Sequence, residues 1–386
     1  MLHLLLRLLA GLLATPRRLR GWRRGRETRG AYQTLLEGLK ALEERAWGPA
    51  EKRLGRAAAE LEVPLVPWLG AARAAHGRGD VVARDGYLEL ASREAPGAEL
   101  AVGLARAELQ LADGEREAAR ATLEGLLAAE PRNRQVLGLL APLYRDLADW
   151  PALWKLLAPL RKEGVVAPAE LEDLEDATCL GLLAQAATGG QAALQEQWDR
   201  IPRAAQARPR LVAAFCDHLI AAGAQEQAEA LLRKALQRDW DRLLIERYGL
   251  AVGRDPATQL AWAERFLGDH PDDPKLLLTL GRLCLANRLW GKARTYLEAS
   301  LGADPRPEVC QELGRLLEEL GEAEAALACY RRGLTRATGI ARNDDAKPPG
   351  GRRPQSDASV VTEGAATPKR RNRSPRLPQP RSLPAG

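Results

Sequence analysis

The chain has 386 residues, and 57 Lys and Arg against 51 Asp and Glu give it a formal net charge of +6 at pH 7. Ala, Leu, Glu and Arg are abundant, whereas β-forming aromatic residues are scarce, with only two Phe and six Tyr, so we expect an all-α protein. Residues 1–30 carry +7 and residues 340–386 carry +6, which leaves residues 31–339 at −7. A mildly acidic body binds nucleic acid duplexes poorly, so no specific nucleic acid is expected as a partner.

Residues 1–16, MLHLLLRLLAGLLATP, form an apolar stretch. A secretory signal has its positive charge before the apolar run, but here the arginines follow it, so cleavage is not expected. A transit peptide is also Arg-rich, yet these arginines are grouped together instead of being spread around a helix. As a helix, residues 1–15 would be about 22 Å long, short of the roughly 30 Å hydrocarbon core. The stretch alone therefore predicts a membrane-associated helix at the interface.

Residues 17–30 are Arg-rich, and we expect them to lie next to the membrane. The membrane-proximal basic residues are Arg17, Arg18, Arg20, Arg23, Arg24, Arg26 and Arg29.

A repeat runs through residues 31–339. In one copy a small residue, Gly281, is followed by Ala293, by the large apolar Leu297 and by Pro305. The same offsets recur in Ala107, Ala119, Leu123 and Pro131, and the first three positions recur in five further copies. Successive first anchors lie 33, 36, 34, 75, 65 and 33 residues apart, close to one or two units of about 34.

Helical hairpins explain this spacing. Small residues allow two helices to cross closely, and the large residue fills the gap to the next unit. The pattern resembles the tetratricopeptide repeat and predicts a solenoid, because no unit can bury its apolar face alone. The anchors do not align around residues 165–205 and 250–270, where we expect degenerate helix pairs. Residues 340–386 are rich in Pro, Gly, Ser and Arg and are expected to be a disordered tail.

The sequence has no recognisable catalytic, cofactor or metal motif. It has no GxGxxG, Walker loop, GxSxG, HExxH or CxxC, and Cys216 and His218 lie two residues apart on an expected helix, so they point to different faces. We therefore expect no enzyme, no cofactor and no metal.

A solenoid instead offers a face formed by the first helix of each unit, which typically binds a protein or peptide. Offsets from each small anchor, together with one position six residues before Gly281, place these residues on a predicted protein-binding groove: Trp68, Glu108, Arg145, Asp217, Lys275, Arg282, Gln311 and Arg315.

The order of segments resembles the HemY family of proteobacterial inner-membrane proteins over roughly residues 5–335. The apolar stretch and arginines lead directly into ETRGAYQTLLEGLKALEERAWGPAEKRL. The similarity continues through DWPALWKLLAPLRKEGV (149–165), ALLRKALQRDWDRLLIERYG (230–249) and PEVCQELGRLLEELGEAEAALACYRRGL (307–334). The resemblance implies that residues 1–16 are the cytoplasmic end of a second transmembrane helix, with a start upstream of Met1. The arginines of residues 17–30 would then place the repeats on the cytoplasmic side, because positive charge beside a transmembrane segment favours that side.

The resemblance also implies a function. It points to a membrane-anchored helical-repeat protein of late haem biosynthesis that organises or regulates the porphyrin-handling enzymes without catalysing a step, with those enzymes as partners. The same family name is used for an unrelated flavin-dependent protoporphyrinogen oxidase, but the missing dinucleotide fingerprint argues against that identity. Three alternatives stay open: an assembly adaptor for cell-envelope or lipopolysaccharide biogenesis, a direct haem or porphyrin binder, and a basic tail that binds RNA or anionic lipid.

Overall fold

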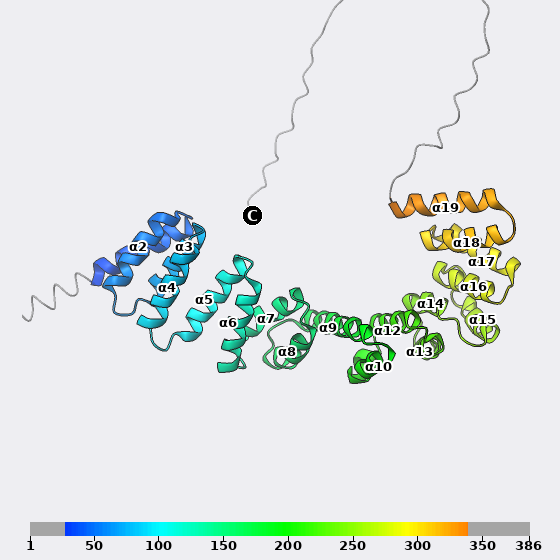
Figure 1. The fold of residues 1–386 in the computed structure, drawn as a ribbon, viewed down its shortest axis with the longest axis horizontal. Helices are drawn as coiled ribbons and strands as arrows, with labels where there is room; N and C mark the ends of the chain where they lie inside the picture. The colour runs from blue at the N-terminus through cyan, green and yellow to red at the C-terminus, as the bar shows by residue number, and fades with distance from the viewer. Residues whose placement is uncertain (1–27, 339–386) are drawn as a thin grey trace, which may run out of the picture. The chain divides into compact units, whose positions relative to one another are not determined.

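The structure, a computed structural model, describes residues 28–338, and within that range the chain is helical with no strand. Figure 1 shows the helices following one another as consecutive pairs joined by short turns. By backbone contacts, the described residues up to Leu334 form one unit. The predicted all-α class is confirmed for the described residues, whereas the predicted membrane-associated helix and disordered tail lie outside them.

The helices alternate between two positions in each pair, which we call first helices and second helices. The first helices are residues 28–43, α3 (Leu65–Gly77), α5 (Glu99–Ala112), α7 (Arg134–Asp146), α9 (Pro168–Thr188), α12 (Pro209–Ala221), α14 (Arg242–Tyr248), α16 (Pro274–Ala286) and α18 (Pro307–Glu319). The second helices are α2 (Trp47–Glu60), α4 (Val81–Glu94), α6 (Arg116–Ala129), α8 (Trp150–Glu163), α10 (Gln191–Arg200), α13 (Gln225–Arg238), α15 (Pro256–Glu264), α17 (Trp290–Ala303) and α19 (Ala323–Thr338).

The repeat anchors pack as the spacing predicts. Leu54 on α2 is fully buried, and it fills the space beside Gly38 in its own pair. A Cβ placed on Gly38 would come within 2.8 Å of Leu54, and one on Gly70 of the next pair would come within 3.0 Å of the same side chain. A Cβ placed on Gly281 would likewise come within 2.6 Å of Leu297. Small residues at these positions therefore let neighbouring helices approach closely around one leucine.

In seven of the nine helix pairs of the described residues, the turn between the two helices uses a left-handed residue. Glycine supplies it in four turns, with φ between 76° and 80° at Gly79, Gly114, Gly223 and Gly321. Three other turns place a residue with a side chain there, namely Arg45 (φ 56°), Ala148 (φ 54°) and Arg288 (φ 57°). The backbone thus keeps one turn geometry even where the sequence lacks the glycine that suits it.

The stretches where the anchors fail to align are helical but irregular. Helix α9 has 21 residues and α10 only 10, and they are separated by Gly189 and Gly190. A short helix, α11 (Arg203–Gln206), then precedes α12. Around 250–270, α14 and α15 have 7 and 9 residues, and a 3-10 turn, η1 (Arg265–Gly268), follows α15. Altered helix lengths shift the anchors, which explains why a fixed period of 34 does not align them.

Over residues 28–338 no helix is both long enough and apolar enough to cross a bilayer. The predicted anchor at residues 1–16 falls outside the described residues. So do six of the seven membrane-proximal arginines, and only Arg29, which is exposed on the helix over residues 28–43, is described.

Candidate functional site

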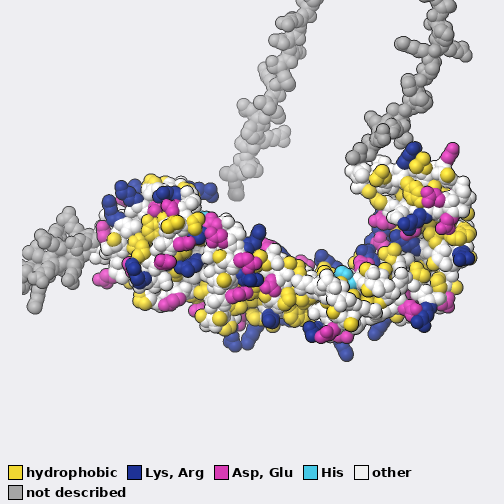
Figure 2. Space-filling model, in the orientation of Figure 1, with side chains coloured by type: hydrophobic (Ala, Val, Ile, Leu, Met, Phe, Trp, Pro, Cys, Tyr) yellow, Lys and Arg dark blue, Asp and Glu magenta, His cyan; other side chains and the backbone are white. Residues whose placement is uncertain are grey.

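All eight predicted groove residues lie on first helices. Arg145 on α7, Asp217 on α12 and both Gln311 and Arg315 on α18 are exposed. Glu108 on α5 and both Lys275 and Arg282 on α16 are half-buried. Figure 2 shows that basic and acidic side chains are interspersed over the visible face and are not separated into blocks of one sign.

Trp68 is the exception, because the structure places it in the core. Its side chain packs between α3 and α4, where it stacks on Tyr87 with ring centroids 5.7 Å apart. Its Nε1 donates a hydrogen bond to Glu94 at 2.9 Å. With 9% of its surface exposed, Trp68 stabilises the second pair and does not present its ring to a partner. Its place in the predicted groove is therefore corrected.

Several of the remaining residues pair with the next first helix along the chain. Asp217 on α12 accepts from Arg247 on α14 at 3.3 Å. Arg282 on α16 donates to Glu312 on α18 at 3.0 Å. Near the other end, Glu108 on α5 lies 3.5 Å from Arg73 on α3 and accepts a hydrogen bond at 3.1 Å from Gln135 on α7. These contacts connect successive first helices through their side chains.

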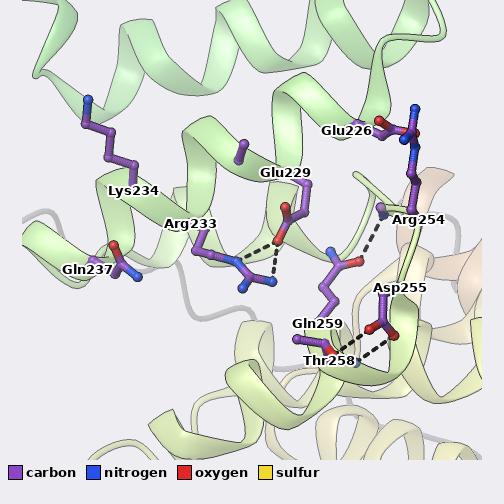
Figure 3. Close-up of a pocket in the computed structure, with 11 residues that line it drawn as sticks. Glu226, Glu229, Arg233, Lys234, Gln237, Arg254, Asp255, Thr258 and Gln259 are labelled. Carbon is purple, nitrogen blue, oxygen red and sulfur yellow. Dashed lines mark hydrogen bonds and ion pairs between the residues drawn. The ribbon is translucent and has the colours of Figure 1, made fainter.

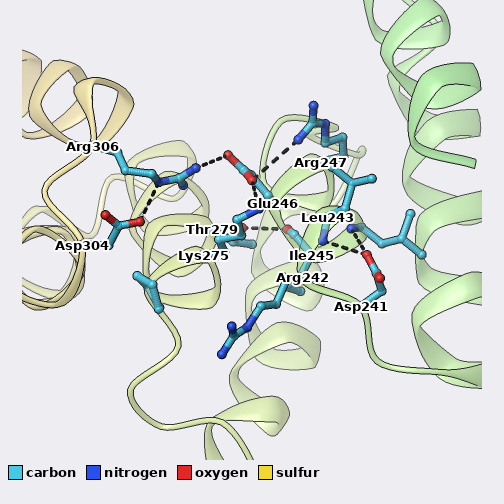
Figure 4. A network of polar contacts seen from close by, with 12 residues as sticks. Asp241, Arg242, Leu243, Ile245, Glu246, Arg247, Lys275, Thr279, Asp304 and Arg306 are labelled. Atoms are coloured by element: carbon cyan, nitrogen blue, oxygen red, sulfur yellow. Dashed lines mark hydrogen bonds and ion pairs between the residues drawn. The ribbon is translucent and has the colours of Figure 1, made fainter. Parts of the chain in front are cut away.

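Glu246 on α14 is the centre of the most extensive of these networks (Figure 4). Its carboxylate lies 3.0 Å from Lys275 Nζ, 2.9 Å from Arg306 Nη1 and 3.6 Å from Arg247 Nη1. Because Arg247 also contacts Asp217, the network runs from α12 to the residue that precedes α18.

Burial and charge act in opposite directions on Glu246. Burial alone would raise the pKa of this carboxyl, since only 8% of the residue is exposed. Hydrogen bonds from Lys275 and Arg306, and the charges of both residues, outweigh burial and lower the pKa of Glu246 below its ordinary value of 4.5. Glu246 is therefore ionised at neutral pH and fixes two basic side chains from later repeats.

Sequence reasoning did not select Glu246, Arg247 or Arg306, because the anchors skip the α14 unit. The sequence does contain an anchor for this unit. Gly249 lies 33 residues after Cys216 and 32 before Gly281, which is the position that the repeat of about 34 residues predicts for a small anchor. The position three residues before that glycine, one of the offsets used for the groove, is Glu246.

A hollow of about 410 Å³ lies on the side of the second helices, between α13 and the start of α15 (Figure 3). Its charges are of both signs, and several of them pair with one another. Glu229 accepts from Arg233 at 2.8 Å and from the hydroxyl of Tyr248, also at 2.8 Å. Gln259, 1% exposed, donates to the carbonyls of Tyr248 and Ala251 and accepts from the Gly253 amide. These contacts hold the irregular α14–α15 pair together.

Three cysteines of the described chain, Cys179, Cys216 and Cys284, are buried thiols. Burial is the main cause that raises the pKa of Cys216 to about 12 and those of Cys179 and Cys284 to about 11. Cys216 is fully buried and belongs to the core. Between residues 28 and 338, no three His, Cys, Asp or Glu side chains come together as metal ligands.

Comparison with known proteins decides the family. A sequence model described as HemY protein N-terminus matches residues 1–79. Protein HemY of Escherichia coli K12 is 30% identical over 329 residues, which cover 85% of this chain and 82% of that protein. The chain belongs to the HemY family. Protein HemY of Shigella flexneri matches the chain with the same identity and coverage.

Two solved structures are also similar to this HemY-family chain. The crystal structure of the APC/C hetero-tetramer Cut9–Hcn1 matches with a TM-score of 0.35 and 14% identity, covering 80% of this chain and 66% of that one. A tetratricopeptide repeat protein from Parabacteroides merdae matches with a TM-score of 0.28 and 14% identity, covering 70% and 98%.

Proposed function

We propose that this member of the HemY family is a non-catalytic, membrane-anchored scaffold or regulator that acts through protein–protein contacts in late haem biosynthesis. The observation that carries the proposal is the row of paired charges on the first helices, centred on Glu246 and its partners Lys275 and Arg306. Side chains held in place by such pairs lose little freedom when a partner binds, and alternating charges favour a partner with the complementary pattern.

Exposed residues on the same face supply groups for a partner to contact. Arg145, Gln311 and Arg315 lie on first helices and are exposed. A partner that spans several repeats would meet these side chains while the internal ion pairs stay formed. We expect the late haem-biosynthesis enzymes to be the partners, as membership of this family implies.

The N-terminus would keep the repeats at the membrane. Residues 1–16 supply an apolar segment and residues 17–30 supply the arginines that favour the cytoplasmic side. The proposed location is therefore the bacterial inner membrane, with the repeats facing the cytoplasm.

A deletion strain complemented with matched variants tests the proposal. The face variant combines Arg145→Glu with Arg315→Glu, and the control combines Arg56→Glu with Arg116→Glu, which lie exposed on second helices and make the same charge change. Deletion should raise porphyrin intermediates and lower haem, measured by chromatography of extracted pigments. The wild-type and control proteins should restore both, and the face variant should not. Unchanged porphyrin and haem in the deletion strain would refute the proposal.

A further inference from the structure

A second hollow, of about 760 Å³, lies between α13 and the segment formed by α10, α11 and α12. It exists where the repeat is irregular, because α10 is short and α11 is inserted before α12. Its walls include Trp198 from α10 and the apolar side chains of Val212 and Leu231. This hollow lies beside α13, away from the ion pairs of the first-helix face.

Basic residues line this hollow without an acidic counterpart. Arg203 comes from α11, and Lys234 and Arg238 come from α13 at i, i+4 spacing. All three side chains are exposed, and no Asp or Glu lines the hollow. Within residues 28–338, none of the three lies within salt-bridge distance of a carboxylate. The neighbouring hollow of Figure 3 shares Lys234 and Gln237 with this one but differs in its acidic residues, since Glu226, Glu229 and Asp255 line it.

The hollow also offers neutral hydrogen-bonding groups. The amides of Gln206 and Gln237 line it, and each amide carries both a donor and an acceptor. Arg238 is held across one wall, because its Nη2 donates to the Ala207 carbonyl at 2.6 Å. In Figure 3, Lys234 points away from the Glu229–Arg233 pair, so that acidic group does not neutralise it.

We infer that this hollow binds an acidic segment of a partner protein, with carboxylates directed at Arg203, Lys234 and Arg238 and an apolar side chain against Val212 and Leu231. The glutamine amides suit the alternating donors and acceptors of a peptide backbone. Three basic groups without a carboxylate partner in the described residues complement such a segment in charge. The site extends the proposed scaffold, because it is a docking position independent of the first-helix face.

A peptide fits these observations better than phosphate or a lipid surface. The hollow sets the apolar side chains of Val212 and Leu231 beside its basic groups, which suits a ligand with both an apolar side chain and negative charge, whereas inorganic phosphate has no apolar part. A flat bilayer does not enter a concave hollow with apolar walls. The chain's own ends fit poorly as well, since residues 1–30 and 340–386 carry +7 and +6 and would be repelled.

Fluorescence polarisation with the full-length protein tests the site. The probe is a fluorescein-labelled peptide of Glu and Leu that carries a photo-crosslinking benzophenone, and a peptide with Lys in place of Glu is its control. The hollow variant combines Arg203→Glu, Lys234→Glu and Arg238→Glu. A matched variant, Arg56→Glu with Arg116→Glu and Lys162→Glu, reverses three exposed charges elsewhere on second helices. Thermal unfolding followed by circular dichroism should show that both variants fold.

The acidic probe should bind the hollow variant about tenfold more weakly than it binds the matched variant. Its crosslinks should fall within residues 198–212 and 231–238. Equal weakening in the two variants, or crosslinks confined to the basic termini, would overturn the inference. So would a hollow variant that loses binding to phosphatidylglycerol vesicles or inorganic phosphate but keeps the peptide. The first-helix variant Arg145→Glu with Arg315→Glu should bind the probe normally, which separates failure of this site from failure of the proposed function.

Discussion

Lys275 and Glu246 form an ion pair of 3.0 Å that joins α16 to α14. Arg306 approaches the same carboxylate at 2.9 Å, so one acidic side chain holds basic groups from two later segments. The side chain of Glu246 is 11% exposed, which shields these contacts from water and salt more than a surface ion pair. Removing this one carboxylate should therefore affect stability more than removing a solvated one.

Glu246→Ala should lower the free energy of unfolding by about 3 kcal/mol, because it leaves Lys275 and Arg306 without their shared partner. Urea unfolding followed by circular dichroism measures the change. Glu89→Ala on α4 is a suitable control, since Glu89 is exposed, and it should change stability by less than about 0.5 kcal/mol. Equal effects of the two substitutions would contradict the network.

The same carboxylate predicts how stability depends on pH. The pKa of Glu246 is lowered in the folded protein, so its contribution is fully present above the ordinary value of 4.5 and is lost as the pH falls through the folded-state pKa. Urea unfolding at a series of pH values should show wild-type protein losing stability below pH 4.5 more steeply than Glu246→Gln. Parallel curves for the two proteins would show that Glu246 does not titrate in this way.

The left-handed turns predict a stabilising substitution. Ala148→Gly and Arg288→Gly should each raise the free energy of unfolding by roughly 0.5–1 kcal/mol, because glycine adopts φ near 55° without a Cβ penalty. Gly114→Ala, at the equivalent turn, should lower it by a similar amount. Urea unfolding of the three variants measures these changes in the free energy of unfolding. A loss of stability in Ala148→Gly would contradict the turn geometry.

Close helix crossing predicts opposite effects for two glycines of one pair. Gly281→Ala should destabilise by about 1–3 kcal/mol, because the new Cβ would lie 2.6 Å from the buried Leu297. Gly302→Ala on α17 should instead stabilise by about 0.5–1 kcal/mol, since nothing lies within 4 Å and alanine favours a helix. Thermal unfolding of both variants tests this contrast, which fails if the two changes have the same sign.

Burial of the thiols predicts slow modification. Cys216, whose pKa is raised to about 12, should react with Ellman's reagent at pH 8 only as the protein unfolds. Cys329 is only half-buried and should react faster. Mass spectrometry of the modified peptides distinguishes the two, and rapid labelling of Cys216 in folded protein would contradict its place in the core.

The sequence predicted the regular pairs because their packing depends on residue size at fixed spacing. The close approach of Gly38 to Leu54, and of Gly281 to Leu297, joins two helices of the same pair. Such contacts can be predicted from the sequence alone, because both residues lie at a fixed spacing along the chain. The Glu246 network was missed because α14 is only 7 residues long and its anchor was not aligned. The position of Trp68 was also missed, because its hydrogen bond to Glu94 depends on a side chain 26 residues away on the next helix.

The hollow beside α13 was beyond sequence reasoning for a related reason. Arg203 and Lys234 are separated by one whole helix and two turns, and only the inserted α11 brings them to one hollow. A basic residue on a helix surface is ordinarily solvated, so its type alone does not distinguish a binding position. The short α10 and the inserted α11 bring these basic residues to the same hollow.

Site-specific photo-crosslinking in native membranes tests the central claim most directly. A photoreactive amino acid at Gln311 or Arg315 on the first-helix face is compared with one at Arg116 on a second helix, and crosslinked proteins are identified by mass spectrometry. We predict that late haem-biosynthesis enzymes crosslink from Gln311 and Arg315 and not from Arg116. Absence of these enzymes from the Gln311 and Arg315 products, or their equal capture from Arg116, would contradict a scaffold that acts through the first helices.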